Sequence, residues 1–203
     1  QNSLHAGATK IEFIFDQGLM TFKDNGQGMS KERMIEAMLT MGGSFKESGN
    51  IGGFGKAKNL LLFCHESFVL HSLDTCAAGE CLNYEFVPCE FFNGTKIEIV
   101  PTPDFSYNRI EQENKLKEFL LKCNLNCQVF INGQRFTHWK TLPFCRSLDW
   151  CDLLVGKKSD SCYMDVYKNG LWMFNSYIRD LDKEVAIEVK GNSLDVFTQS
   201  RDG

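Results

Sequence analysis

Three short segments of this 203-residue chain have the composition of a nucleotide-binding site. Residues 1–8 contain Asn2, whose side-chain carbonyl is a hard oxygen ligand of the kind that Mg²⁺ prefers. Residues 24–29 begin with Asp24, a carboxylate that can accept a hydrogen bond from the amino group of an adenine. Residues 51–59 are rich in glycine, and the backbone N–H groups of such a stretch can surround a phosphate. In series, the three segments predict a site for ATP and Mg²⁺.

The first segment is predicted to form a short helix, residues 1–9, that carries more than a metal ligand. His5 and Ala6 follow Asn2 by three and four residues, so the three side chains share one face of the helix. The small Ala6 leaves room for a planar ring, and His5 can form a hydrogen bond nearby. The alternative interpretation is that Asn2 only caps the helix, a position that asparagine favours.

The second segment is predicted to be a loop that leaves a strand. Gly26 and Gly28 allow the backbone to approach a base and sugar closely, and Met29 offers a soft apolar surface for the base. A plain Asn-Gly turn is the alternative interpretation. It explains residues 24–26 but gives no reason for Gly28.

The third segment is predicted to hold the phosphates. Its candidate binding residues are Gly52, Gly53, Phe54, Gly55, Lys56, Ala57 and Lys58. The backbone N–H groups, the positive end of the helix predicted to follow, and the two lysines would all favour an anion. The spacing is not that of a Walker loop. A flexible surface loop is the alternative interpretation.

Together, these segments resemble the motifs of the GHKL ATPases, which share the Bergerat fold and include gyrase B, the ninety-kilodalton heat-shock chaperones, MutL-type mismatch-repair proteins and MORC proteins. Residues 2–9 are similar to the MutL version of the first motif, with His5 where that family usually has Asp. Residues 24–29 match the second motif, and residues 51–55 resemble the chaperone-type third motif. Residues 94–97 match the fourth.

The resemblance implies roles for further residues. Thr95 would join Asp24 and a water at the adenine. Ser44 and Lys46 would lie in a lid, where a lysine often meets the terminal phosphate. The family's general base is a glutamate one helical turn before the motif asparagine, which is a position upstream of Gln1. We therefore assign no catalytic residue within this chain, and we expect further residues before its first one.

For the intact protein, the resemblance implies Mg²⁺-dependent ATP binding with slow hydrolysis, closure of a lid, and a change in association state such as formation of a homodimer. The MutL-like first motif favours DNA-associated work, with DNA or a DNA-associated protein bound through segments outside this sequence. Two alternatives stay open. One is a nucleotide-sensing or scaffold module that does not hydrolyse ATP. The other is histidine-kinase-like phosphotransfer, for which the sequence shows no phospho-acceptor helix.

The expected fold class is α/β, a two-layer sandwich of Bergerat type with a mixed, mainly antiparallel sheet and helices on one face. It would occupy residues 1–137. Residues 138–203 would form a partial β-rich extension, for which the start of a transducer-like domain is one interpretation. The predicted strands are 10–15, 19–23, 67–74, 82–88, 95–100, 127–131, 163–167, 171–174 and 185–189. The predicted helices are 30–39, with Ser30 as N-cap, 56–65 and 110–123. In the extension, Lys190 and Arg201 are candidates to reach the terminal phosphate, although a surface turn is the favoured interpretation of residues 200–203.

Composition and charge narrow the class of protein further. A net charge of −4 without a basic stripe argues against tight DNA binding by this segment alone. No apolar run approaches the roughly 18 residues of a membrane helix. The nine cysteines are an odd number without a C-x2-C pair. They favour a reducing compartment, cytoplasmic or in a eukaryote nuclear, over disulfides or a zinc site.

Overall fold

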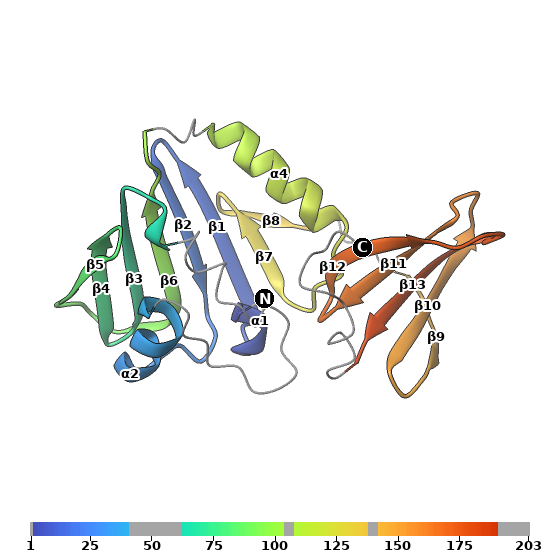
Figure 1. The fold of residues 1–203 in the computed structure, drawn as a ribbon, viewed down its shortest axis with the longest axis horizontal. Helices are drawn as coiled ribbons and strands as arrows, with labels where there is room; N and C mark the ends of the chain where they lie inside the picture. The colour runs from blue at the N-terminus through green and yellow to red at the C-terminus, as the bar shows by residue number, and fades with distance from the viewer. Residues whose placement is uncertain (1, 41–61, 104–107, 138–141, 191–203) are drawn as a thin grey trace. The chain divides into compact units, whose positions relative to one another are not determined.

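A computed structural model of the chain describes residues 2–40, 62–103, 108–137 and 142–190 (Figure 1). These residues divide into two compact units. The first contains residues 2–40, 62–103, 108–116 and 127–137, and the second contains residues 117–126 and 142–190. Each unit is built on a sheet of its own and is described separately.

An eight-stranded sheet forms the first unit, in the order β5-β4-β3-β6-β2-β1-β7-β8. Its strands are β1 (Lys10–Asp16), β2 (Leu19–Asp24), β3 (Ser67–Leu73), β4 (Thr75–Glu80), β5 (Asn83–Val87), β6 (Phe92–Val100), β7 (Gln128–Ile131) and β8 (Gln134–Phe136). Every neighbouring pair is antiparallel except β1 and β7, which run parallel. The sheet is therefore mixed and mainly antiparallel, as the sequence predicts.

Alternation with a period of two explains which side of this sheet is buried. In β3, the side chains of Phe68, Leu70 and Ser72 are buried, and the residues between them are only partly buried. The strand register places Phe68 opposite Ile99 and Leu70 opposite Ile97 of β6. Because cross-strand partners lie on the same side of a sheet, these residues form one continuous apolar face.

The opposite face of the same sheet carries two charged pairs. Lys23 of β2 pairs with Glu12 of β1 at 3.1 Å, and Lys96 pairs with Glu98 within β6 at 2.9 Å. Such pairs can remain in contact with water on one side of an antiparallel sheet.

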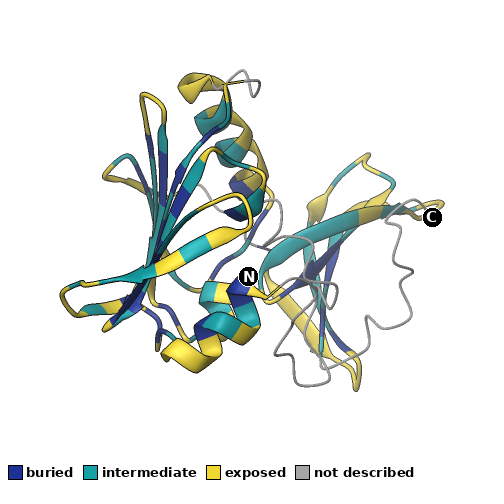
Figure 2. Cartoon of the chain, turned by 60° about the vertical axis from the view of Figure 1, so that its left-hand side comes forward, coloured by how far each residue is buried: buried dark blue, intermediate teal, exposed yellow. Residues whose placement is uncertain are grey.

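Short helices accompany the first sheet. They are α1 (Asn2–His5), α2 (Lys31–Met34) and the π-helical turn η1 (Ile35–Leu39), and the longer α4 (Arg109–Leu121) begins in this unit. Ser30 caps α2, as predicted, by accepting a hydrogen bond from the Arg33 backbone N–H at 3.4 Å. In Figure 2, α1 and α2 lie on the same side of the sheet, where Met34 is fully buried.

The sequence predictions for this unit make the first helix too long and miss the strands β4 and β8. The first helix is shorter than expected and ends at His5, because the chain turns at Gly7, which has a φ of 70°. Strand β4 was not predicted at all. Its residues 76–79 read Cys-Ala-Ala-Gly, and alanine and glycine carry no strand signal of their own. The pairing of β4 with both β3 and β5 supplies what the local sequence lacks.

The second unit is a five-stranded sheet in the order β12-β11-β13-β10-β9. Its strands are β9 (Phe144–Ser147), β10 (Cys151–Lys158), β11 (Tyr163–Lys168), β12 (Leu171–Tyr177) and β13 (Lys183–Val189). The predicted hairpin is confirmed as β11 and β12, joined through Asn169 and Gly170 with φ of 51° and 71°. Two consecutive residues with positive φ are typical of the tight turn that an Asn-Gly pair favours.

Both faces of the second sheet carry apolar residues. Consecutive residues of β11 serve opposite faces, because Val166 packs with Ile187 and Val189 while Tyr167 packs with Leu142 and Ala186. The segment that follows α4 also belongs to this unit. Within the described residues, no helix combines the length and the apolar character needed to cross a membrane.

Candidate nucleotide site

A row of polar side chains crosses one end of the otherwise apolar face of the first sheet. The strand register pairs Thr75 of β4 with Ser72 of β3, Ser72 with Thr95 of β6, and Thr95 with Asp24 of β2. We call these four residues the polar row. Thr75 and Ser72 are buried, whereas Thr95 and Asp24 are only partly buried. Asp24 and Thr95 are thus direct cross-strand neighbours, although they lie far apart in the sequence.

The carboxylate of Asp24 is held in place from two sides. The Ser3 hydroxyl of α1 donates a hydrogen bond to Asp24 Oδ2 at 2.6 Å, and the Gly26 backbone N–H donates one to Asp24 Oδ1 at 2.9 Å. Each oxygen keeps a second lone pair for a further donor. Sequence analysis did not single out Ser3, although its place directly after Asn2 in the first motif is a signal that could have found it.

Asn25 explains how the loop after β2 is shaped. Its side-chain oxygen accepts hydrogen bonds from the backbone N–H groups of Thr9 at 2.9 Å and Lys10 at 2.8 Å. Its amide nitrogen donates to the Thr9 hydroxyl at 2.8 Å. Asn25 therefore joins the loop to the start of β1, and it follows directly on Asp24, the member of the polar row at the end of β2.

The glycines of the second segment are required by close approach within the protein. A Cβ on Gly26 would lie 2.9 Å from both the Cβ and the carbonyl oxygen of Ala6, and the next residue, Gln27, donates its N–H to that carbonyl at 2.9 Å. Gly28 has a φ of 70°, and a Cβ there would lie 2.7 Å from the Leu73 side chain. The structure thus supplies the reason for Gly28 that a plain Asn-Gly turn lacks.

Gly94 brings the second and fourth sequence motifs into contact. It has a φ of 116°, and a Cβ there would lie only 2.0 Å from the carbonyl oxygen of Asp24. No side chain fits in that space, so glycine is needed for β6 to reach the end of β2. The same approach sets Thr95, the next residue, beside the Asp24 side chain.

The remaining candidates fall into two groups. Asn2 and His5 are exposed on α1, Ala6 is partly buried against the loop, and Met29 is partly buried at the end of that loop. The other candidates lie outside the described residues: Ser44, Lys46, Gly52, Gly53, Phe54, Gly55, Lys56, Ala57, Lys58 and Arg201.

Lys190 has a local structural role. Its ammonium group lies 2.7 Å from the Asp152 carboxylate and donates to the Leu148 carbonyl oxygen at 2.9 Å and to the Ser147 hydroxyl. The Lys190 and Ser147 hydrogen bonds lower the pKa of the Asp152 carboxyl. An ammonium group has three protons to donate, and these three acceptors use them within the second unit.

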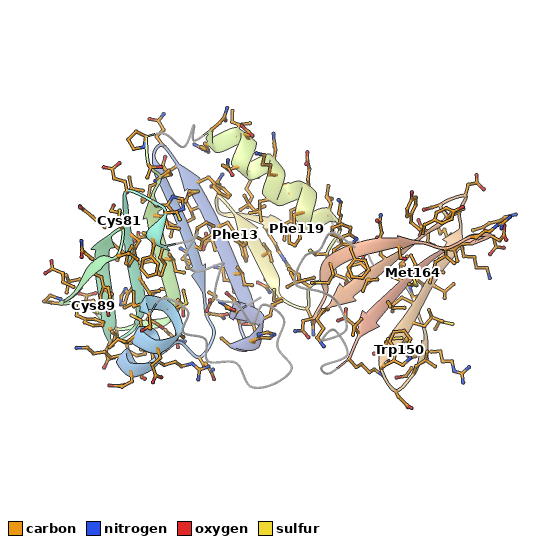
Figure 3. All side chains as sticks on the ribbon, viewed as in Figure 1. Phe13, Cys81, Cys89, Phe119, Trp150 and Met164 are labelled. Atoms are coloured by element: carbon orange, nitrogen blue, oxygen red, sulfur yellow. The ribbon has the colours of Figure 1, made fainter. Side chains whose placement is uncertain are left out.

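The cysteines show no sign of reactive chemistry where they are buried. Burial raises the pKa of the Cys76, Cys123 and Cys151 thiols, so the thiolate form is disfavoured at each. Cys81 and Cys89 lie at the β4–β5 side of the first sheet (Figure 3). Among the described residues, no group of three or more His, Cys, Asp or Glu side chains is placed to hold a metal ion.

The fold is that of the GHKL ATPase domains, as the resemblance in sequence predicted. The ATPase region of Saccharomyces cerevisiae topoisomerase II is similar with a TM-score of 0.59 and 12% identity, over 94% of this chain and 72% of that one. The same region bound to ICRF-187 (dexrazoxane) has a TM-score of 0.58 and 12% identity, over 94% and 73%. The Aquifex aeolicus MutL ATPase domain complexed with ADP has a TM-score of 0.54 and 16% identity, over 93% and 88%.

No protein-family model and no curated protein matches the sequence. With identities of 16% or less, the structural comparisons concern the fold alone.

Proposed function

We propose that this chain binds ATP together with Mg²⁺ at the end of the first sheet where α1, the loop after β2 and the start of β6 meet. The observation that carries the proposal is Asp24, a partly buried carboxylate in a polar row on an otherwise apolar sheet face. Polar side chains on such a face need a reason, because burying them is costly unless they are paired. An adenine amino group is a donor that would pair with this carboxylate.

The other described candidates fit the chemistry of the same ligand. Thr95 is the cross-strand neighbour of Asp24 and offers a hydroxyl to the base edge. Met29 offers a polarizable apolar surface for the ring. Asn2 offers an exposed amide oxygen from α1, and a Mg²⁺ there would take most of its remaining ligands from phosphate oxygens and water. When bound, Mg²⁺ would neutralise phosphate charge.

The glycine-rich segment is proposed from its sequence as the phosphate site. The backbone N–H groups of Gly52, Gly53 and Gly55 would donate to phosphate oxygens, and Lys56 and Lys58 would add positive charge. Ser44 and Lys46 would belong to the lid that closes over the nucleotide. The role of the glycine-rich segment is proposed from its residue types, and the lid role of Ser44 and Lys46 from the resemblance to the GHKL motifs.

In the intact protein we propose slow ATP hydrolysis, with a general base supplied from a position before Gln1. Lid closure on ATP would then change the association state, for example by forming a homodimer. The similarity to the ATPase domains of topoisomerase II and MutL favours DNA-associated work. The two-layer Bergerat sandwich with a transducer-like extension is the architecture that this proposal requires.

Binding is tested by the thermal stability of the chain with and without ATP and Mg²⁺. ATP is expected to raise the melting temperature when Mg²⁺ is present. Asp24→Asn should abolish the rise. The asparagine side-chain oxygen can still accept one of the two hydrogen bonds that the Asp24 carboxylate accepts, and the N–H₂ group would then face the amino donor on the base.

Asp180→Asn is the matched control for charge. Asp180 is exposed in the second unit. Within the described residues its one ion pair is with the exposed Arg179, at 3.8 Å. It should leave the ATP-induced rise unchanged. An unchanged rise in Asp24→Asn would refute the assignment of Asp24 to the base.

A further inference from the structure

Ser72 of β3 is a fully buried polar residue that sequence analysis did not single out. Its hydroxyl oxygen lies 2.6 Å from the Gly94 carbonyl oxygen, 2.8 Å from the Met29 backbone nitrogen and 3.3 Å from the Thr95 hydroxyl oxygen. One side chain thus contacts the loop after β2, the start of β6 and the neighbouring member of the polar row.

The direction of each of these hydrogen bonds follows from counting protons. A hydroxyl group has one proton to donate and two lone pairs that can accept. The Gly94 carbonyl oxygen can only accept, so the Ser72 hydroxyl donates its proton to it. The Met29 N–H can only donate, so it occupies one lone pair of the Ser72 oxygen. The remaining Ser72 lone pair faces Thr95. The Thr95 hydroxyl must therefore be the donor in its contact with Ser72.

We propose that Ser72 is a positioning residue that turns the Thr95 hydroxyl into an acceptor toward the base. With its own proton committed to Ser72, Thr95 Oγ1 can only accept from a ligand, and the Asp24 carboxylate beside it also only accepts. An exocyclic amino group has two protons and can donate to both of these acceptors, whereas a keto oxygen at the same ring position can donate to neither, so the acceptor-only edge favours the purine with the amino group. The inference deepens the proposed function and rests on it.

The backbone around Ser72 is shaped to make these contacts. The register between β3 and β6 shifts between Ser72 and Leu73, and Leu73 adopts a φ of 54°. This left-handed conformation is unfavourable for leucine, and it persists in a fold only where the surroundings determine it. Here the Leu73 side chain packs against Gly28, and the bulge leaves the Ser72 hydroxyl between Gly94 and Met29.

The test compares the dissociation constants of ATP and ITP, each with Mg²⁺, by calorimetry on the chain. ITP carries a keto group and a ring N–H where ATP carries an amino group and a bare ring nitrogen. The unmodified chain is expected to prefer ATP. In Ser72→Ala the Thr95 hydroxyl is free to rotate and donate, so the preference should fall by about three- to tenfold.

The ratio of the two constants separates positioning from mere support of the fold. If Ser72 only stabilised the loop that carries Met29, Ser72→Ala would weaken ATP and ITP by the same factor. Should Ser72→Ala be too unstable to measure, Ser72→Cys keeps a side chain of similar shape with a much weaker donor, and the same fall in the ratio is expected.

Two further variants place the effect on Thr95. Thr95→Val removes the hydroxyl and should lower the ATP preference, and adding Ser72→Ala to it should lower the preference no further. Thr75→Val is the matched control, because Thr75 flanks Ser72 on its other side and its hydroxyl contacts Asp74 at 3.3 Å. It should leave the ratio unchanged.

The outcomes distinguish this inference from the function on which it rests. Tight ATP binding with an unchanged ratio in Ser72→Ala or Ser72→Cys overturns the role of Ser72 and leaves the proposed function standing. A further fall in the double variant also overturns it, because Ser72 would then act by another route. Equal binding of ATP and ITP by the unmodified chain overturns the acceptor-only edge, and binding of neither overturns the proposed function itself.

Discussion

The two sheets of this chain use their polar side chains in different ways. In the first sheet, Asp24 and Thr95 stand side by side at the partly exposed end of the polar row and keep lone pairs for a further donor. In the second, the Lys168 ammonium donates to the Val189 carbonyl at 3.1 Å, and the Trp172 ring N–H donates to Asp165 at 2.9 Å. Polar groups that bond to one another serve packing, whereas groups with spare acceptor capacity at the partly exposed end of the row remain available to a ligand.

A second comparison concerns the glycine in each unit that touches the backbone of another segment. Gly94 of the first unit touches Asp24, and Gly170 of the second touches Asn124, where an added Cβ would lie 2.1 Å from a carbonyl oxygen. The two contacts are equally tight, but only the first adjoins the polar row. Tight packing by itself therefore does not mark a site. The residue types beside it do.

The largest effect that sharpens this comparison is expected from glycine substitutions. Gly94→Ala and Gly170→Ala should each lower the free energy of unfolding by more than about 3 kcal/mol, because the backbone must move to admit the methyl group. Gly133→Ala is the control, since its φ of 77° is similar to that of Gly170 and no atom lies within 4 Å of the added Cβ. It should cost only about 1–2 kcal/mol. Urea denaturation of the three variants measures the difference, and equal losses would show that φ alone matters.

A smaller effect, dependent on pH, is expected at Glu188 in the second sheet. Burial raises the pKa of the Glu188 carboxyl, even though the Gly170 backbone N–H donates to it at 3.2 Å. A raised pKa in the folded state means that the contribution of Glu188 to stability is complete below the unfolded pKa, near 4.5, and is lost as pH rises through the folded value.

Glu188→Gln removes this titration but keeps an acceptor for Gly170. The variant should therefore gain stability relative to the unmodified chain between pH 4 and pH 7, as measured by urea denaturation at both. A difference that stayed constant with pH would show that Glu188 is as well solvated as it is in the unfolded chain. Glu188 would then not be a closed, buried group, and the contrast between the polar side chains of the two sheets would fail.

The smallest effect is expected at Tyr167. Its side chain is 2% exposed, and its hydroxyl has no hydrogen-bond partner within the part of the chain that the structure describes. Burial also raises the pKa of this hydroxyl, so it stays neutral. Tyr167→Phe should change the free energy of unfolding by between zero and about 1 kcal/mol in the stabilising direction, because an unsatisfied group is removed. Tyr163→Phe, at an exposed position, is the control, and a clear loss in Tyr167→Phe alone would reveal a hidden partner.

Local signals in the sequence predicted much of the fold. The alternation of residues 10–15 and 19–23 predicted the β1–β2 hairpin, and Asn169-Gly170 predicted the turn between β11 and β12. These elements depend on residues close together in the chain, so their patterns can be read directly. Strand β4 could not be found in this way, because its alanines and glycine become a strand only through the neighbours on both sides.

The candidate site shows the same division. Asp24 and the motif glycines could be singled out from the sequence, because a carboxylate and glycines next to apolar segments are visible in it, and Thr95 was implied by the resemblance to the GHKL motifs. Ser72 was hidden because it occupies the next buried position after Phe68 and Leu70, and a small serine there reads as part of the strand. The alternation of buried and partly buried positions contains the signal that could have found it, since a polar residue on the buried face needs hydrogen-bond partners.

By itself, the sequence determined the local elements, the order of the motifs and the residue types available for chemistry. Only the tertiary structure decided that Asp24, Thr95 and Ser72 stand in one row, with Ser3 closing over Asp24 from α1. The physical reason is that β2, β6 and β3 are distant in the chain. Their register is set by burial of a whole sheet face, which no local pattern contains.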